Sequence, residues 1–234
     1  MSSVEVPPPS SREQTKRPVV CVFCGSSKGT SQHVEAAVAL AHAFADQGIS
    51  LVYGGGTTGI MGELAKTLVS RSGPESVHGI IPEALVEFEQ AGRPGTPNAT
   101  APKDPTANQK AIFGRTTVVK TMHTRKQLMA KEVMEGGPGS GFVALSGGFG
   151  TMEELMEMTT WNQLGIHNNG VVVFNVGGFY DGLIQWVKTA VSEGFIAPRN
   201  GGILVEALDA EEVVKQLKEY QTSEERFNLD WSEK

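Results

Sequence analysis

Short apolar runs alternate with longer amphipathic segments along this chain from residue 18 onward. The short runs are rich in β-branched residues, as expected of strands buried on both faces of a parallel sheet; they cover residues 19–24, 49–53, 77–81, 117–120, 141–145, 171–175 and 203–205. The longer segments repeat apolar residues at helical spacing, and they cover residues 31–47, 60–70, 124–135, 151–164, 181–193 and 211–220. Repeated strand–helix units predict an α/β fold, with a doubly wound parallel sheet and helices on both faces.

The pattern also predicts how the chain is divided. It contains no linker that would separate two domains, so we expect a single domain over residues 18–220. Residues 1–17 include a run of prolines and are interpreted as a disordered N-terminal lead, and residues 221–234 as a charged C-terminal tail. Two glycine- and proline-containing breaks, at 90–109 and 135–141, are predicted to be surface loops.

Composition narrows the possible partners. The 234 residues carry a net charge of −6 and have no basic run, which argues against binding a nucleic acid polymer. A small phosphorylated ligand needs only one local cationic pair, so it remains compatible with this charge. No window approaches the roughly 20 apolar residues that span a bilayer, so we expect no membrane association.

Two cysteines, Cys21 and Cys24, are spaced as in redox or metal motifs. Both lie in the first apolar run, and residues three apart on a strand point to opposite faces of the sheet. We therefore predict two structural thiols that cannot share a metal. Few thiols and no signal peptide favour a reducing, cytoplasmic location.

Three turns follow strands and precede helices, at the edge where open α/β sheets bind ligands. They are residues 25–27, 54–59 and 147–151, and all contain glycine. Together they are expected to surround a phosphate and a sugar, with the first two turns contributing Gly25, Ser26, Gly55 and Gly56. The second turn also satisfies G-x-G-x-x-G, and Glu83 follows at the end of the next strand, as a dinucleotide site would require.

The third turn carries two acids, Glu153 and Glu154, one turn into the predicted helix. Acids beside a phosphate turn indicate bond-breaking chemistry, because a simple phosphate cradle does not need them. The alternative is structural. Thr151 and Glu154 match a capping box, in which Thr151 is the N-cap and Glu154 reaches back to its N–H.

A second segment, residues 122–127, opens the preceding helix with Thr124 as its predicted N-cap. Arg125 and Lys126 then lie in the first turn, where the helix dipole disfavours cations. The simplest compensation is an anion, either a ligand phosphate or a carboxylate such as Glu154. The alternative is a solvated pair. His123 is assigned no role.

These segments together resemble the LONELY GUY family, the cytokinin riboside 5′-monophosphate phosphoribohydrolases, often labelled lysine decarboxylases. The family signature PGGxGTxxE is similar to residues 146–154, SGGFGTMEE, and the companion motif MHxRK to residues 122–126, MHTRK. Residues 24–27, 53–62 and 160–167 are similar to further family blocks, so the resemblance runs from about Val19 to about Val205. The main departure is Ser146, where the family usually has proline.

The resemblance implies a Rossmann-like fold and a homodimer whose sites involve both subunits. It implies hydrolysis of the N-glycosidic bond of N6-substituted adenosine 5′-monophosphates, with AMP as a further candidate substrate. The family's catalytic pair falls on Arg125 and Glu154. Its substrate contacts fall on Glu89, Arg125, Lys126, Gly148, Phe149, Gly150, Thr151, Met152, Glu153, Glu154 and Thr160.

A mechanism follows from these residues. Glycosidic cleavage develops positive charge on the ribose, which the Glu154 carboxylate would stabilise while it accepts a proton from the attacking water. Arg125 would orient Glu154, and the third turn would hold the 5′-phosphate. No metal or cofactor is needed. Three other interpretations stay open: a non-catalytic nucleotide-binding module, an NAD-dependent oxidoreductase that uses residues 54–59, and a pyridoxal-phosphate decarboxylase.

Overall fold

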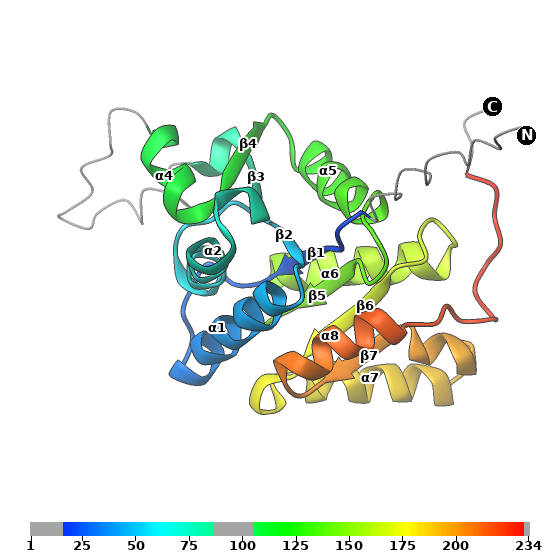
Figure 1. Ribbon diagram of the computed structural model, residues 1–234. Coiled ribbons are helices and arrows are strands. Elements are labelled where there is room, and N and C mark those ends of the chain that lie inside the picture. Colours follow the sequence, from blue (N-terminus) through cyan, green and yellow to red (C-terminus); the bar gives the residue numbers. More distant parts are fainter. Residues whose placement is uncertain (1–15, 87–104, 232–234) are drawn as a thin grey trace, which may run out of the picture.

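The computed structural model describes residues 16–86 and 105–231. In this part of the chain, seven parallel strands form one sheet in the order β4-β3-β2-β1-β5-β6-β7 (Figure 1). Every predicted strand is present and the predicted fold class is confirmed. The strands are β1 (Val19–Phe23), β2 (Ser50–Tyr53), β3 (Val77–Pro82), β4 (Arg115–Val119), β5 (Gly141–Ala144), β6 (Gly170–Phe174) and β7 (Leu204–Ala207).

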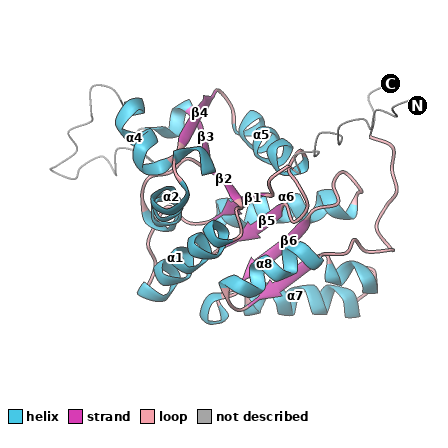
Figure 2. Cartoon of the chain, viewed as in Figure 1, coloured by secondary structure: helices cyan, strands magenta, loops and turns pink. Residues whose placement is uncertain are grey.

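Helices cover both faces of the sheet, as Figures 1 and 2 show. The helices α1 (Ser31–Asp46), α2 (Gly59–Ser72) and α8 (Ala210–Glu219) pack on one face, where Phe44, Leu64 and Val213 belong to one apolar cluster. The helices α5 (Met122–Met134), α6 (Phe149–Gln163) and α7 (Asp181–Ser192) pack on the other, around Met129 and Leu155. This burial on both faces explains why the strand sequences are apolar throughout.

Two predicted helix starts are wrong. The helix α6 begins at Phe149 with Gly148 as its N-cap, so Thr151 lies inside the helix and cannot cap it. The helix α5 begins at Met122, and its N-cap is Thr121 rather than Thr124. The Thr121 hydroxyl accepts a hydrogen bond from the backbone N–H of Thr124 at 3.1 Å, which is the geometry of a side-chain cap.

The loop predicted at 90–109 is partly a helix. The helix α4 (Pro105–Phe113) begins inside it, with proline at the first helical position where the missing N–H costs nothing. Residues 87–104 lie outside the described residues, and so does Glu89. The expected loop at 135–141 joins α5 to β5, although its last residue, Gly141, is the first of that strand.

The C-terminal segment lies against the end of α6. The backbone N–H of Phe227 donates to the Gln163 carbonyl at 2.8 Å, and the Trp231 indole N–H donates to the Leu164 carbonyl at 3.0 Å. The predicted lead (1–17) lies outside the described residues up to position 15. In the described ranges, no helix has both the length and the apolar character needed to cross a bilayer.

The strand order reverses between β1 and β5, because β1 continues through α1 to β2 on one side while β5 lies on the other. Ligands of open α/β sheets bind where such a reversal opens a crevice at the carboxyl ends of the strands. The first and third glycine turns meet there, with the Gly25 N–H donating to the Ser146 carbonyl at 3.0 Å. The second turn joins them through the Met61 N–H, which donates to the Gly25 carbonyl at 3.3 Å.

Candidate active site

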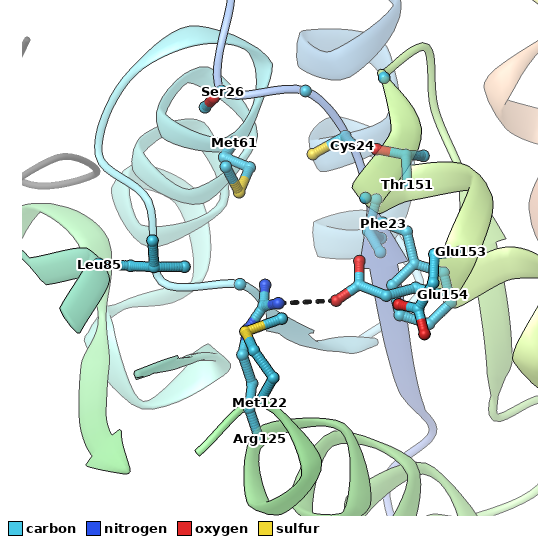
Figure 3. Close-up of a pocket in the computed structure, with 15 residues that line it drawn as sticks. Phe23, Cys24, Ser26, Met61, Leu85, Met122, Arg125, Thr151, Glu153 and Glu154 are labelled. Atoms are coloured by element: carbon cyan, nitrogen blue, oxygen red, sulfur yellow. Dashed lines mark hydrogen bonds and ion pairs between the residues drawn. The ribbon is translucent and has the colours of Figure 1, made fainter. Parts of the chain in front are cut away.

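A cavity of about 300 Å³ opens at this reversal, between the carboxyl ends of β1 and β5 (Figure 3). All three glycine turns and the start of α5 contribute to its lining. The lining residues are Val22, Phe23, Cys24, Gly25, Ser26, Gly54, Met61, Leu85, Met122, Arg125, Gly148, Gly150, Thr151, Glu153 and Glu154. The cavity therefore brings together both predicted catalytic residues and six of the other predicted site residues: Gly25, Ser26, Gly148, Gly150, Thr151 and Glu153.

Arg125 and Glu154 form an ion pair in the cavity. The Arg125 Nη1 donates to the Glu154 Oε1 at 2.8 Å, and the two side chains are only 11% and 8% exposed (Figure 3). The Arg125 Nε donates to the Ile80 carbonyl at the end of β3, at 3.0 Å. The guanidinium is thus held by the sheet on one side and directed at the carboxylate on the other.

The second turn makes room for this arginine. A Cβ atom on Gly54 would fall on the Arg125 guanidinium, so only glycine fits at this position. Gly55 and Gly56, predicted to contact phosphate or ribose, are buried and do not line the cavity. The second turn therefore supports Arg125, and its cavity contact is through Gly54.

Burial raises the pKa of the Glu154 carboxyl, while the neighbouring Arg125 guanidinium opposes the shift. The carboxylate of Glu153 nearby adds to the increase in pKa. A carboxyl group with a raised pKa, beside a fixed cation and open to a cavity, is typical of a general base or acid. The capping-box alternative is wrong, because Thr151 is not the N-cap and Glu154 is bonded to Arg125.

Lys126 does not line the cavity, but it is bonded to Glu153, which does. Its Nζ donates to the Glu157 Oε1 at 3.1 Å and to the Glu153 carboxylate, and its side chain is 13% exposed. Burial lowers the pKa of Lys126, but the hydrogen bonds to Glu153 and Glu157 outweigh it and the net pKa is raised. The expected compensation of two adjacent cations is thus confirmed: both are neutralised by carboxylates of α6.

The N-terminus of α6 opens into the cavity through Gly148 and Gly150. A Cβ atom at either position would have no atom within 4 Å, so both glycines border open space. The first N–H groups of a helix have no partner inside the helix, and together with the dipole they favour an anion. This end of the cavity is suited to a phosphate.

Three predicted contacts lie elsewhere. Phe149 is 98% exposed, Met152 packs against the apolar cluster on the α5–α6 face, and Thr160 lies on the exposed surface of α6. None of the three lines the cavity.

The sequence reasoning missed the apolar side of the cavity. Met61 of α2, Leu85 of the short turn η2 (Glu83–Leu85) and Met122 of α5 lie across the cavity from Thr151 and Glu154 (Figure 3). The sequence pattern indicates these three residues only weakly, because each one merely follows a predicted turn or strand end at the edge of the sheet.

Cys21 and Cys24 are buried on opposite faces of the sheet, as predicted, and they form no disulfide with each other. Among the residues that the structure describes, no three His, Cys, Asp or Glu side chains are grouped so that they could hold a metal ion.

Comparison with known proteins agrees with this geometry. The family model described as "Possible lysine decarboxylase" matches residues 61–217. A bifunctional cytokinin biosynthesis protein of Fusarium pseudograminearum is 49% identical over 93% of this chain, which spans only 43% of that longer protein. A cytokinin riboside 5′-monophosphate phosphoribohydrolase of Arabidopsis thaliana is 40% identical over 92% of this chain and 89% of its own length.

Solved structures show the same fold at low identity. The molybdenum cofactor carrier protein of Chlamydomonas reinhardtii superposes with a TM-score of 0.54 at 18% identity, over 86% of this chain and 98% of the carrier. The molybdenum cofactor binding protein of Rippkaea orientalis gives a TM-score of 0.55 at 15% identity, over 87% and 96%. The sequence relatives and the matched family model show that the chain belongs to the LONELY GUY family, the cytokinin riboside 5′-monophosphate phosphoribohydrolases.

Proposed function

We propose that this protein is a hydrolase that cleaves the N-glycosidic bond of N6-substituted adenosine 5′-monophosphates to give the free base and ribose 5-phosphate. The buried Arg125–Glu154 pair beside a helix N-terminus is the observation that carries this proposal. The names of the curated relatives support the same reaction. Neither a bare nucleotide-binding module nor a nicotinamide site accounts for a buried carboxylate in this place.

In this mechanism the 5′-phosphate binds at the N-terminus of α6, where Gly148, Gly150 and Thr151 line the cavity. This anchor places the ribose C1′ beside Glu154. The bond between C1′ and the base nitrogen breaks, and its electron pair leaves with the base. The carboxylate stabilises the positive charge that develops on the ribose.

A water molecule then forms the new bond to C1′. Glu154 accepts the proton that this water loses and later releases it to solvent, while the departing base takes up one proton from solvent, so the protons balance. The raised pKa of Glu154 suits this role, because a stronger base accepts a proton more readily near neutral pH. The Arg125 guanidinium stays charged, so its role is to fix the carboxylate.

The base is proposed to lie against the side of the cavity formed by Met61, Leu85 and Met122. Methionine side chains adapt their shape, so this apolar wall suits an alkyl substituent on the adenine N6 better than a free amino group. We therefore place the prenylated nucleotide ahead of AMP as substrate.

One incubation series tests the proposed function. The protein is supplied in parallel with isopentenyladenosine 5′-monophosphate, isopentenyladenosine and AMP, and free base and ribose 5-phosphate are quantified. Base release from the prenylated monophosphate with little from the nucleoside is the expected result. Absence of base from every monophosphate would exclude the reaction, and comparable release from the nucleoside would exclude the phosphate anchor.

We also propose a homodimer in the cytoplasm. Met122, which lines the cavity, is 41% exposed, and Phe149, the first residue of α6, is 98% exposed, and a second copy would bury both. Sedimentation of the purified protein tests the dimer: a monomer at micromolar concentration would exclude it. Two buried cysteines without a disulfide between them favour a reducing compartment, which localisation of a tagged protein would check.

A further inference from the structure

Ser146 makes a buried hydrogen bond that the proposed reaction does not use. It lies two residues after the end of β5 and immediately before the third glycine turn, and its Oγ lies 2.9 Å from the Nδ1 of His33. Ser146 is 4% exposed and His33 is 9% exposed. A buried polar pair of this kind is geometrically strict, because each group loses its solvent partners and depends on the other.

His33 lies in the first turn of α1 and packs close to the segment before that helix, since its Cδ2 is only 3.0 Å from where a Cβ atom on Gly29 would stand. Its ring packs edge-on against Phe179, with 5.6 Å between ring centroids. These contacts and its burial support the orientation of the imidazole toward Ser146.

The backbone of Ser146 makes a second connection, because its carbonyl accepts from the Gly25 N–H at 3.0 Å. The third turn is thus joined to the first turn through the Ser146 carbonyl and to α1 through the Ser146 side chain. Both connections are made one residue before Gly147, and the lining residues Gly148 and Gly150 follow. The entry to the phosphate-binding turn is fixed by hydrogen bonds.

A proline at position 146 would fix the backbone angle φ through its ring, without any partner. We propose that His33 and Ser146 are positioning residues for the third glycine turn, and that their hydrogen bond supplies a restraint that such a ring could replace. This inference rests on the proposed function, since it assigns the third turn to the 5′-phosphate. It makes phosphate affinity in this chain dependent on a histidine of α1.

Four single variants test the proposal: Ser146→Ala, His33→Leu, His33→Asn and Ser146→Pro. Base release from isopentenyladenosine monophosphate gives KM and kcat, and calorimetry gives the Kd of ribose 5-phosphate. Ser146→Ala and His33→Leu are each expected to raise KM and Kd about tenfold and to change kcat less than threefold. His33→Asn, whose amide can occupy the place of Nδ1, is expected to retain most of the affinity.

The decisive measurement is the His33→Leu change in the Ser146→Pro background. Proline at 146 removes the hydroxyl and supplies a ring that fixes φ, so we expect Kd to be insensitive to residue 33 there. A tenfold loss in both backgrounds would overturn the proposal, because His33 would then act through general stability. Thermal melts confirm that each variant is folded at the assay temperature.

The two proposals fail in different ways. Unchanged KM and Kd in folded Ser146→Ala and His33→Leu proteins, with an active parent, would overturn the positioning role alone. A parent that releases no base from any monophosphate would instead overturn the proposed function.

Discussion

Two glycine-rich turns of similar composition, residues 54–59 and 147–150, have opposite surroundings. In the second turn, a Cβ atom on Gly54 would meet the Arg125 guanidinium, and one on Gly59 would fall on the backbone of Ser26. In the third turn, a Cβ atom on Gly147 would meet the Thr151 side chain, but Gly148 and Gly150 have no atom within 4 Å of the same position. Gly54, Gly59 and Gly147 thus admit protein atoms, whereas Gly148 and Gly150 leave space for a ligand.

The difference shows why a glycine motif alone does not identify a ligand site. The second turn matches the dinucleotide pattern G-x-G-x-x-G, yet its space is occupied by Arg125 and by the first turn. The third turn has no such pattern, but it borders a cavity and begins a helix. What surrounds a glycine decides whether it serves packing or binding.

The largest effect is expected from Glu154→Gln, which keeps the shape of the third-turn site and removes the carboxylate that acts as general base. Turnover should fall by roughly 100- to 10,000-fold, as for loss of a general base. Base release from the prenylated monophosphate measures it, and a thermal melt checks the fold. Glu157→Gln is the matched control: Glu157 is on the same helix and does not line the cavity, so we expect near-parental turnover. Equal activity of the two variants would remove Glu154 from the mechanism.

Gly59→Ala should destabilise the protein, because it disrupts the second turn. Gly59 has φ of +61°, which costs other residues about 1–2 kcal/mol, and the added Cβ would overlap the Ser26 backbone, which costs a further 1–3 kcal/mol or so. Urea unfolding measures the loss, expected at about 2–5 kcal/mol. Gly48→Ala separates the cost of the backbone angle from the cost of the overlap. Gly48 has φ of +64°, but an added Cβ atom there would have no atom within 4 Å. Equal losses in both variants would contradict the tight packing of the second turn.

Acid should destabilise the folded protein through His167, which is bonded to α6, the helix that begins in the third turn. His167 donates from Nε2 to the Met158 carbonyl of α6, and its Nδ1 accepts from the Asn169 N–H. Burial lowers the pKa of His167 to about 4, so below pH 6.5 the unfolded chain binds a proton that the folded protein does not. The free energy of unfolding should fall by up to about 3 kcal/mol between pH 6.5 and 4.

Urea unfolding at pH 7 and pH 4.5 tests this linkage. His167→Gln keeps a donor and an acceptor without an imidazole, so its stability should depend less on pH over this range. The same pH dependence in variant and parent would show that other groups cause the acid sensitivity.

The smallest effect is expected from Gly148→Ala, which adds a methyl group where the phosphate is proposed to bind. Stability should change by less than about 0.5 kcal/mol, because the added atom meets no protein atom. The KM for the monophosphate should rise about tenfold. Gly182→Ala adds a methyl group in equally open space on α7, and it should leave KM unchanged. An unchanged KM in Gly148→Ala would place the phosphate elsewhere.

Much of the fold could be predicted because its strands are buried on both faces. Apolar β-branched runs marked every strand, and the strand–helix alternation placed three turns at one edge. The start of α6 could not be predicted. Gly148 and Gly150 disfavour a helix, but the first N–H groups of a helix need no helical partner, so the helix begins within the glycine turn.

The Arg125–Glu154 pair was predictable because two cations at a helix start need an anion nearby. The apolar side of the cavity could not be predicted. Met61, Leu85 and Met122 come from three separate elements, and only the strand order brings them together. Hydrophobic periodicity reports which face of an element is buried, but it does not report which elements become neighbours.

The hydrogen bond from Arg125 to the Ile80 carbonyl has a consequence for how this protein can change over time. A main-chain oxygen is present whatever residue occupies position 80, so substitutions there leave the anchor in place. Deleting or inserting one residue in β3 would instead displace that oxygen along the strand and leave the guanidinium without its support. We therefore expect homologous chains to tolerate varied side chains in β3 but to keep its length.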